Sequence, residues 1–293
     1  MKYMDRYGNV TTEDSAQDRL LRMLYTSAPG RMLLKPLVSP LFSKIGGRVM
    51  NTRLSAGLIS GFVRRNAIDL RLYEPKLYTS YNDFFTRKIR PRYRPVAKSE
   101  KVLISPCDGK LSVYPIHNDC SLCIKDTSYT VAQLVGSRQL AAKYAGGCAM
   151  VIRLTVDDYH RYCYAADGLK SKQHRIPGIF HTVNPIANDV MPIYKMNTRE
   201  FCLLKTKNMG TILSMEVGAL MVGKIVNKDR SSCAVTKGTE KGRFEFGGST
   251  IVLLLQKDAV NVDADLLANT KAGYETYVTY GEQIAATSTS VYY

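Results

Sequence analysis

The chain has 293 residues, of which 45% are apolar and 23% are charged, as in an ordinary globular protein with a large core. No apolar run reaches the roughly 18–20 residues of a transmembrane helix, and residues 1–6 lack the apolar core of a signal peptide, so we expect the protein to be made and kept in the cytosol. The net charge is +16, and residues 1–100 hold 19 Lys/Arg against 8 Asp/Glu. Such an excess of positive charge attracts nucleic acid or an anionic membrane surface.

Three N-terminal segments are apolar and rich in basic residues. Residues 14–26 predict a helix, residues 31–45 predict short helices separated by Pro36 and Pro40, and residues 48–65 continue the pattern. Apolar residues interleaved with basic ones in short amphipathic helices suit the plane of a lipid interface. The alternative is that these helices pack on the core. A nucleic-acid surface would add exposed aromatic residues for stacking, and few occur here, so we expect no nucleic-acid partner.

Residues 81–96 mark a boundary in the chain. They combine a pair of phenylalanines with five basic residues and two prolines, which is typical of a helix end that runs into an extended arm. We therefore expect a helical, basic, membrane-associating region over residues 1–96 and a β-rich domain over residues 97–267. Residues 268–293 are polar, and we expect a mobile tail there.

After residue 100, short apolar runs separated by turn residues predict strands. Residues 102–104 and 111–114 resemble a hairpin closed by Cys107-Asp108-Gly109-Lys110, because Asp-Gly is a strong hairpin signal. The sequence therefore predicts an α+β protein, with a β-rich body of antiparallel sheets, barrel-like or sandwich-like, preceded by N-terminal amphipathic helices. Further strands are predicted at residues 149–154, 178–183, 200–206, 211–217, 219–226 and 232–236.

Seven cysteines make an odd number, so they cannot all form disulfides. Cys120 and Cys123 have the spacing of a zinc or redox pair, but no second Cys or His pair flanks them at a zinc-ribbon distance. We expect reduced thiols and no metal site.

Two apolar runs meet at Gly247-Gly248-Ser249-Thr250. The run before this junction alternates apolar and charged residues, and residues 251–255 are continuously apolar, as in a strand covered on both faces. The two glycines permit backbone angles that are closed to other residues. One interpretation is a glycine bend with a solvated serine, and the other is a site where Ser249 attacks the carbonyl of Gly248.

His160 lies in the most charged polar segment of the body, beside Asp157 and Asp158. With Asp108 and Ser249 on other loops, it supplies the parts of a Ser-His-Asp arrangement. His181 is a second candidate for lining a site, and the other two histidines are interpreted as surface residues.

The chain resembles the phosphatidylserine decarboxylase proenzymes along most of its length. Any one matching segment is weak evidence for the resemblance, but the occurrence of all of them in the family's order is strong evidence. The segments are Tyr81-Asn82-Asp83-Phe84-Phe85-Thr86-Arg87, Ser105-Pro106-Cys107-Asp108-Gly109-Lys110, Asp158-Tyr159-His160-Arg161, Thr182-Val183-Asn184-Pro185, Asn197-Thr198-Arg199, Val217-Gly218-Ala219 with Val222-Gly223, Lys237-Gly238-Thr239-Glu240 and the Gly-Gly-Ser-Thr junction.

This resemblance implies a self-processing enzyme. Ser249 would attack the carbonyl of Gly248, and the chain would separate into residues 1–248 and residues 249–293, held in one fold. Residue 249 would become a covalent pyruvoyl group, the electron sink for decarboxylation. By similarity, His160 with Asp108 would be the base that activates the serine, and His160 would also protonate the product carbon.

One position departs from the family pattern. Members often carry a second histidine three residues after the first, and here that residue is Cys163. Both steps would then fall to His160, or Cys163 or His181 would take part. The alternative function is an unprocessed lipid-binding relative that has lost catalysis through this replacement.

The substrate implied by the resemblance is phosphatidylserine in an anionic membrane, which would be converted to phosphatidylethanolamine. The basic N-terminal region would hold the enzyme peripherally at the cytoplasmic face of the cell membrane, and Arg87 would meet the lipid phosphate. The oligomeric state is open, with a homodimer as one arrangement. A basic nucleic-acid-binding protein is the other alternative, and no recognisable binding motif supports it.

Overall fold

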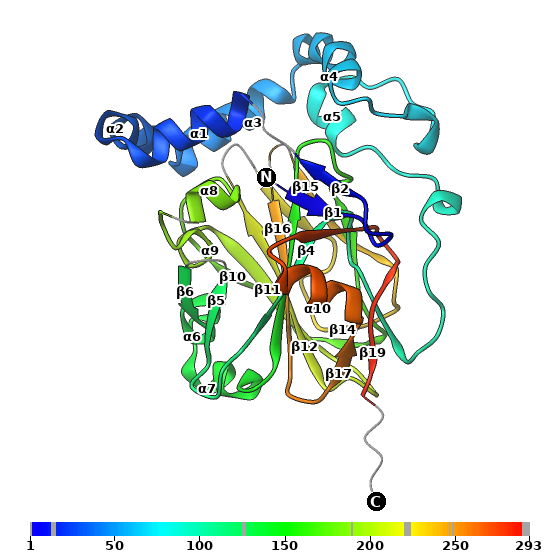
Figure 1. Ribbon diagram of the computed structural model, residues 1–293. Coiled ribbons are helices and arrows are strands. Elements are labelled where there is room, and N and C mark those ends of the chain that lie inside the picture. Colours follow the sequence, from blue (N-terminus) through cyan, green and yellow to red (C-terminus); the bar gives the residue numbers. More distant parts are fainter. Residues whose placement is uncertain are drawn as a thin grey trace, which may run out of the picture.

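The computed structural model describes residues 2–12, 16–124, 127–188, 190–219, 224–245, 247 and 249–288. A β-rich body forms most of the molecule, and the first helices run across one end of it, near α8 (Pro185–Asn188) (Figure 1). In this part of the chain, no helix is long and apolar enough to cross a bilayer.

One large sheet organises the body. Its middle strand, β16 (Ser249–Leu255), lies between β12 (Thr211–Gly218) and β7 (Cys148–Leu154). β1 pairs with β18 in parallel, and the other described strand pairs are antiparallel. Outward from β12, the sheet continues with β11 (Arg199–Lys205), β9 (Gly168–Lys170) and β14 (Cys233–Val235). β10 (His174–Ile176) lies off this path and pairs with β11. Outward from β7, the sheet continues with β4 (Gly109–Pro115), β18 (Glu275–Val278), β1 (Lys2–Met4) and β2 (Val10–Thr12).

Three smaller sheets complete the β structure. They contain β13 (Lys224–Asn227), β15 (Glu240–Glu245) and β8 (Arg161–Cys163); β17 (Val260–Val262), β19 (Gln283–Thr287) and β3 (Val102–Ile104); and β5 (Ser121–Ile124) and β6 (Thr127–Thr130).

The core lies on both faces of the large sheet, because side chains alternate between faces along a strand. On β16, Val252 and Leu254 join a cluster with α1 (Ala16–Thr26) and α2 (Ala28–Leu37). Ile251, Leu253 and Leu255 join a second cluster with β3, β8, β15 and α10 (Ala264–Lys271). The continuous apolar run at residues 251–255 is therefore a strand covered on both faces, as predicted.

The N-terminal helices are short, as the prolines predict. α2 (Ala28–Leu37) ends one residue after Pro36, and α3 (Pro40–Met50) begins at Pro40 behind the cap Ser39. The other helical segments are α1 (Ala16–Thr26), η1 (Arg53–Leu58), α4 (Ile59–Arg65), η2 (Leu70–Leu72), α5 (Tyr81–Phe85), η3 (Pro91–Tyr93), α6 (Val131–Val135), α7 (Arg138–Ala141), η4 (Ala142–Tyr144), α9 (Ile193–Met196) and α10 (Ala264–Lys271).

Helices α1 and α2 are apolar on two sides, whereas the apolar residues that α3 contributes are exposed ones. One side packs on the body, with buried side chains that include Leu24, Tyr25 and Leu34. The other side is exposed, so the packing alternative describes one side, and the lipid-interface prediction for the exposed side stays a prediction. The exposed apolar residues are Leu20, Met23, Met32, Leu33, Leu41, Phe42, Ile45 and Val49.

The α+β prediction is confirmed, and several finer predictions are wrong. The large sheet of the described residues is an open path of strands and not a closed barrel. Segments 102–104 and 111–114 do not form a hairpin, because β3 pairs with β19 and β4 pairs with β7 and β18. Residues 178–183 form an isolated bridge, Ile179 with Asn197, instead of a strand.

The predicted mobile tail is also wrong for residues 268–288. This segment contains the end of α10, β18 of the large sheet and β19, and it buries Thr276, Val278 and Ile284. Its polar residues find long-range partners, such as Arg153 for Glu275, so a polar composition is compatible with an ordered segment. Residues 289–293 lie outside the described residues.

Candidate active site

Ser249 is the first residue of the middle strand. It pairs in register with Gly218 of β12 and Leu154 of β7, and its side chain is 0% exposed. The alternative of a solvated serine is therefore wrong. Among the described residues its hydroxyl has no hydrogen-bond partner. A buried hydroxyl without a partner costs about 1–3 kcal/mol, so an unpaired Ser249 is a candidate reactive group.

The backbone before Ser249 needs glycine at one position. Gly247 has φ 121°, in the region that favours glycine over residues with a side chain. Gly248, whose carbonyl is predicted to be attacked by Ser249, lies outside the described residues.

His160 immediately precedes β8 and is completely buried. Its Nδ1 lies 2.9 Å from the carbonyl oxygen of Asp158. A carbonyl oxygen only accepts, so Nδ1 carries the proton and Nε2 presents a lone pair. Nε2 has no partner among the described residues. The Phe85 ring packs on the imidazole with 4.0 Å between centroids.

The electrostatic surroundings keep His160 neutral. Burial lowers the pKa of His160 to about 3, and the positive charge of Arg87 acts in the same direction. A neutral imidazole with a free Nε2 lone pair is the form that a general base requires. The backbone of His160 also accepts a hydrogen bond from Phe244 N at 2.9 Å, which ties it to β15, the strand that precedes Ser249 in the chain.

The structure does not pair Asp108 with His160. The carboxylate of Asp108 accepts two hydrogen bonds from Arg94, at 2.8 and 2.6 Å, and one from Tyr280 N at 2.7 Å. The partner of the imidazole is instead the backbone of Asp158. The predicted His160–Asp108 pair is therefore absent from this arrangement.

Sequence reasoning missed the residues that hold Asp158 in place. Its carboxylate contacts Lys110 Nζ at 2.9 Å and accepts a hydrogen bond from Thr155 N at 2.7 Å. These contacts fix the turn that aims the Asp158 carbonyl at His160. Lys110 and Asp158 both belong to segments that carry the resemblance to the proenzymes, and that was the available signal.

Cys163 lies in β8 and is 1% exposed. Burial raises the pKa of its thiol to about 12, which favours the protonated form near neutral pH. Its backbone N donates to Pro106 O at 2.8 Å, which places the loop that carries Asp108 against β8.

Arg87 is 2% exposed and lies over two aromatic rings. Its guanidinium carbon is 4.5 Å from the Tyr73 ring centroid and 4.7 Å from that of Phe84. One nitrogen donates to Tyr73 Oη at 3.2 Å and to Asp157 O at 3.0 Å. Nε and the other terminal nitrogen have no partner in the described part of the chain, so this buried cation could bind an anionic group.

His181 connects the N-terminal helices to the strand that faces Ser249. Tyr25 Oη accepts from Thr182 N at 3.1 Å, so its proton points to His181 Nδ1, also at 3.1 Å. Burial lowers the pKa of His181. Asn197 donates to the carbonyls of His181 and Gly218, both at 2.8 Å, and Gly218 is the register partner of Ser249.

The fold and the site define this molecule as an α+β protein with a buried serine at the start of its middle strand and a neutral histidine beside an adjoining sheet. A profile of the family described as phosphatidylserine decarboxylase matches residues 81–286. Phosphatidylserine decarboxylase proenzyme 2 of Clostridium acetobutylicum is 46% identical over 269 residues, 92% of each chain.

Two further relatives are named phosphatidylserine decarboxylase proenzyme. The one from Clostridium botulinum is 37% identical over 277 residues, 93% of this chain and 94% of the relative, and the one from Ruminiclostridium cellulolyticum is 38% identical over 277 residues, 93% and 92% respectively. The chain belongs to the phosphatidylserine decarboxylase family, whose members are carboxy-lyases, and the predicted resemblance is confirmed.

Proposed function

We propose that this chain is a pyruvoyl-dependent decarboxylase that forms its prosthetic group from its own Ser249 and converts phosphatidylserine to phosphatidylethanolamine. The relatives' names supply the reaction and the proenzyme state. The observation that carries the proposal is the buried hydroxyl of Ser249 at the start of β16, which has no hydrogen-bond partner among the described residues. A pyruvoyl group fits this position because it is made from the residue itself.

Self-processing begins when Ser249 Oγ attacks the carbonyl carbon of Gly248. The hydroxyl proton passes to a base, the peptide C–N bond breaks with protonation of the nitrogen, and an ester replaces the amide. Elimination then removes a proton from Cα of residue 249 and breaks its Cβ–Oγ bond, which releases residues 1–248 with a carboxylate end. Water hydrolyses the dehydrated residue, ammonia leaves, and residues 249–293 begin with the pyruvoyl group.

His160 is the base in this proposal. Its Nδ1 proton is held by the Asp158 carbonyl at 2.9 Å, so the Nε2 lone pair is the one free to accept the serine proton. The pyruvoyl group, when formed, supplies the electron sink for loss of carbon dioxide. The imidazole, once protonated, would donate to the product carbon. Because the Cys163 thiol is held neutral, both proton transfers are assigned to His160.

Asp108, Arg87 and His181 have supporting roles in the proposal. Asp108 holds its loop to the guanidinium of Arg94 and to the backbone of Tyr280. Arg87 offers a buried positive charge close to His160 for an anionic part of the headgroup. His181 positions Gly218, and through it Ser249, by way of Asn197.

The membrane-facing part of the proposal concerns α1–α3. Their exposed apolar side chains would enter the lipid interface, and each Lys or Arg near an anionic leaflet contributes about 1 kcal/mol. The enzyme would then be a peripheral protein at the cytoplasmic face of the membrane, with its two chains remaining in one fold.

Intact-mass measurement tests the proposal. Purified wild-type protein is expected to give a fragment of residues 1–248 and a fragment of residues 249–293 that begins with pyruvoyl, and to release carbon dioxide from phosphatidylserine vesicles. A folded protein that stays as one uncleaved chain would contradict the proposal and support the unprocessed lipid-binding alternative.

A further inference from the structure

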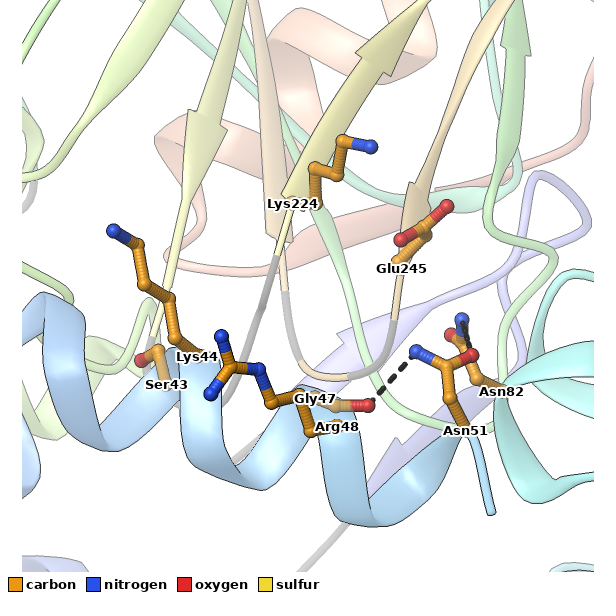
Figure 2. A pocket seen from close by; sticks show the side chains of 8 residues that line it. All are labelled: Ser43, Lys44, Gly47, Arg48, Asn51, Asn82, Lys224 and Glu245. Carbon is orange, nitrogen blue, oxygen red and sulfur yellow. Dashed lines mark hydrogen bonds between the residues drawn. The ribbon is translucent and has the colours of Figure 1, made fainter. Parts of the chain in front are cut away.

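A cavity of about 270 Å³ lies between α3 and the ends of β13 and β15. Ser43, Lys44 and Arg48 line it from α3, and Lys224 and Glu245 line it from the strands (Figure 2). We call it the headgroup pocket. Lys44 and Arg48 extend from the side of α3 that faces the strands (Figure 2).

The headgroup pocket has an excess of positive charge. Lys44, Arg48 and Lys224 are exposed, and none of them has an ion-pair partner among the residues that the structure describes. The single carboxylate, Glu245, lies 3.1 Å from Arg243 and is neutralised from outside the pocket. Three uncompensated cations around one cavity favour a ligand with negative charge.

A second, independent observation concerns Ser43. Its side chain is 1% exposed, and its hydroxyl has no hydrogen-bond partner within the described residues. Most buried hydroxyls in proteins are paired, and an oxygen atom of a ligand in the adjoining cavity would satisfy this one.

The side-chain amides of Asn51 and Asn82 hold α3, which forms one wall of the pocket, in place. Asn51 donates to Gly47 O at 2.8 Å and accepts from Asn82 at 2.9 Å, so the C-terminal end of α3 is attached to α5 (Figure 2). The positions of Ser43, Lys44 and Arg48 on α3 are therefore fixed before any ligand arrives, which lowers the entropic cost of binding.

We propose that the headgroup pocket binds the phosphodiester group of the substrate phospholipid. This inference rests on the proposed function and adds the residues that hold the substrate. Arg, Lys and hydroxyl donors are the groups that recognise phosphate oxygens. The volume of about 270 Å³ is just below the usual range for ligand sites of drug size, so it suits a headgroup and not the acyl chains.

The position of the pocket favours a lipid over a free anion. On α3, Leu41, Ile45 and Val49 are exposed, so the same helix has an apolar surface for the bilayer and a cationic surface for the headgroup. Glu245 ends β15, only four residues before Ser249. A lipid that remains in the bilayer would thus reach past α3 toward the reactive residue.

This assignment replaces Arg87 as the residue that binds the phosphate. Arg87 is 2% exposed, lies over two rings and lines a separate cavity of about 230 Å³, whereas Lys44, Arg48 and Lys224 are exposed at the headgroup pocket. A serine headgroup has two anionic groups, a phosphodiester and a carboxylate, so Arg87 remains available for the second.

The test uses a water-soluble, short-chain phosphatidylserine, so that general attraction to a membrane does not contribute. The K44Q/R48Q variant is expected to self-cleave normally, to keep kcat within about twofold and to raise KM at least tenfold. The matched control is K207Q/K257Q, which removes two exposed charges from turns at the other end of the large sheet and should leave KM unchanged. An unchanged KM in K44Q/R48Q overturns the proposal.

Binding to the uncleaved S249A protein provides a readout that does not need activity. Glycerophosphoserine should bind to S249A in calorimetry, and adding K44Q/R48Q should weaken it at least tenfold. Adding S43A should weaken binding severalfold without lowering the melting temperature, because the lost hydroxyl was unpaired. Inorganic phosphate should bind more weakly; equal or tighter binding of phosphate would make the pocket a free-anion site and overturn the lipid assignment.

The two proposals fail in different ways. A wild-type protein that never cleaves contradicts the proposed function, and the calorimetry with S249A still decides the pocket. A wild type that cleaves and decarboxylates, together with variants that bind and react like it, contradicts only the headgroup pocket.

Discussion

The imidazole of His160 donates its Nδ1 proton to the backbone carbonyl of Asp158 at 2.9 Å. A backbone acceptor fixes the tautomer and the ring orientation as a carboxylate would, but it adds no full negative charge. The imidazole is therefore oriented while burial still holds its pKa at about 3. Four experiments examine the consequences for the site.

Replacing Ser249 by Ala should abolish cleavage and decarboxylation and leave one chain of 293 residues. Because the hydroxyl is buried and finds no partner in the part of the chain that the structure describes, the free energy of unfolding should stay the same or rise by about 1 kcal/mol. Thr250→Val is the control, since Thr250 is equally buried and its hydroxyl also lacks a described partner. That variant should still cleave; its failure to do so would mean that Ser249 is not the specific reactive group. Mass spectrometry and chemical denaturation measure the two effects.

The buried neutral His160 predicts a pH dependence of stability. Its pKa is lowered to about 3 in the folded protein and is about 6.5 in the unfolded chain, so between these values the unfolded state binds more protons. Stability should therefore fall as the pH falls from about 6.5 toward 3, by at most about 1.4 kcal/mol per pH unit from this group. The S249A protein and the same protein with the additional substitution His160→Gln should differ in this slope of stability against pH. An equal change of stability with pH in the two proteins across this range would contradict the assignment.

Removing the carboxylate charge of Asp108 should act mainly on stability. Asp108→Asn leaves the partly buried guanidinium of Arg94 without its bidentate charged partner, and a hydrogen bond to a charged group contributes about 1.5–3 kcal/mol. The rate of self-cleavage at a temperature where the variant is folded should fall far less than in His160→Gln. Equal losses of rate in the two variants would restore Asp108 as a direct partner of the histidine in the reaction.

The thiol of Cys163 should be dispensable for proton transfer. Because burial raises its pKa to about 12, Cys163→Ala should retain cleavage and decarboxylation within about threefold, with a small loss of stability from the lost packing. Rates are measured by electrophoresis and by carbon dioxide release. A loss of a hundredfold or more in a folded variant would assign the thiol a role in the chemistry.

Local patterns predicted much of this fold. The prolines placed the break between α2 and α3, and the continuous apolar run at residues 251–255 gave the middle strand. The order of the segments in the chain also identified the family. These features depend on residues that are close in the sequence, so the sequence alone was sufficient for them.

The errors concern partners that are distant in the chain or belong to the backbone. Asp108 was predicted to close a hairpin and to pair with His160, but Arg94 binds its carboxylate. A carbonyl two residues before His160 took the role that was expected of a side chain. Residues 275–278 of the predicted tail form a strand between β4 and β1, in which Val278 is buried and Glu275 meets Arg153. Side-chain chemistry named the candidates, and only the three-dimensional contacts could decide between them.

The place of β16 in the large sheet determines what a break before Ser249 would leave behind. β16 is hydrogen-bonded between β12 and β7, and β18 is hydrogen-bonded between β4 and β1, so the piece starting at residue 249 is interleaved twice with the longer piece. After such a cleavage, the two polypeptides could separate only if the hydrogen bonds along both β16 and β18 were broken. Separated pieces would then have to rebuild the sheet from its middle strand outward, so the proposed cleavage would leave two polypeptides that fold only together.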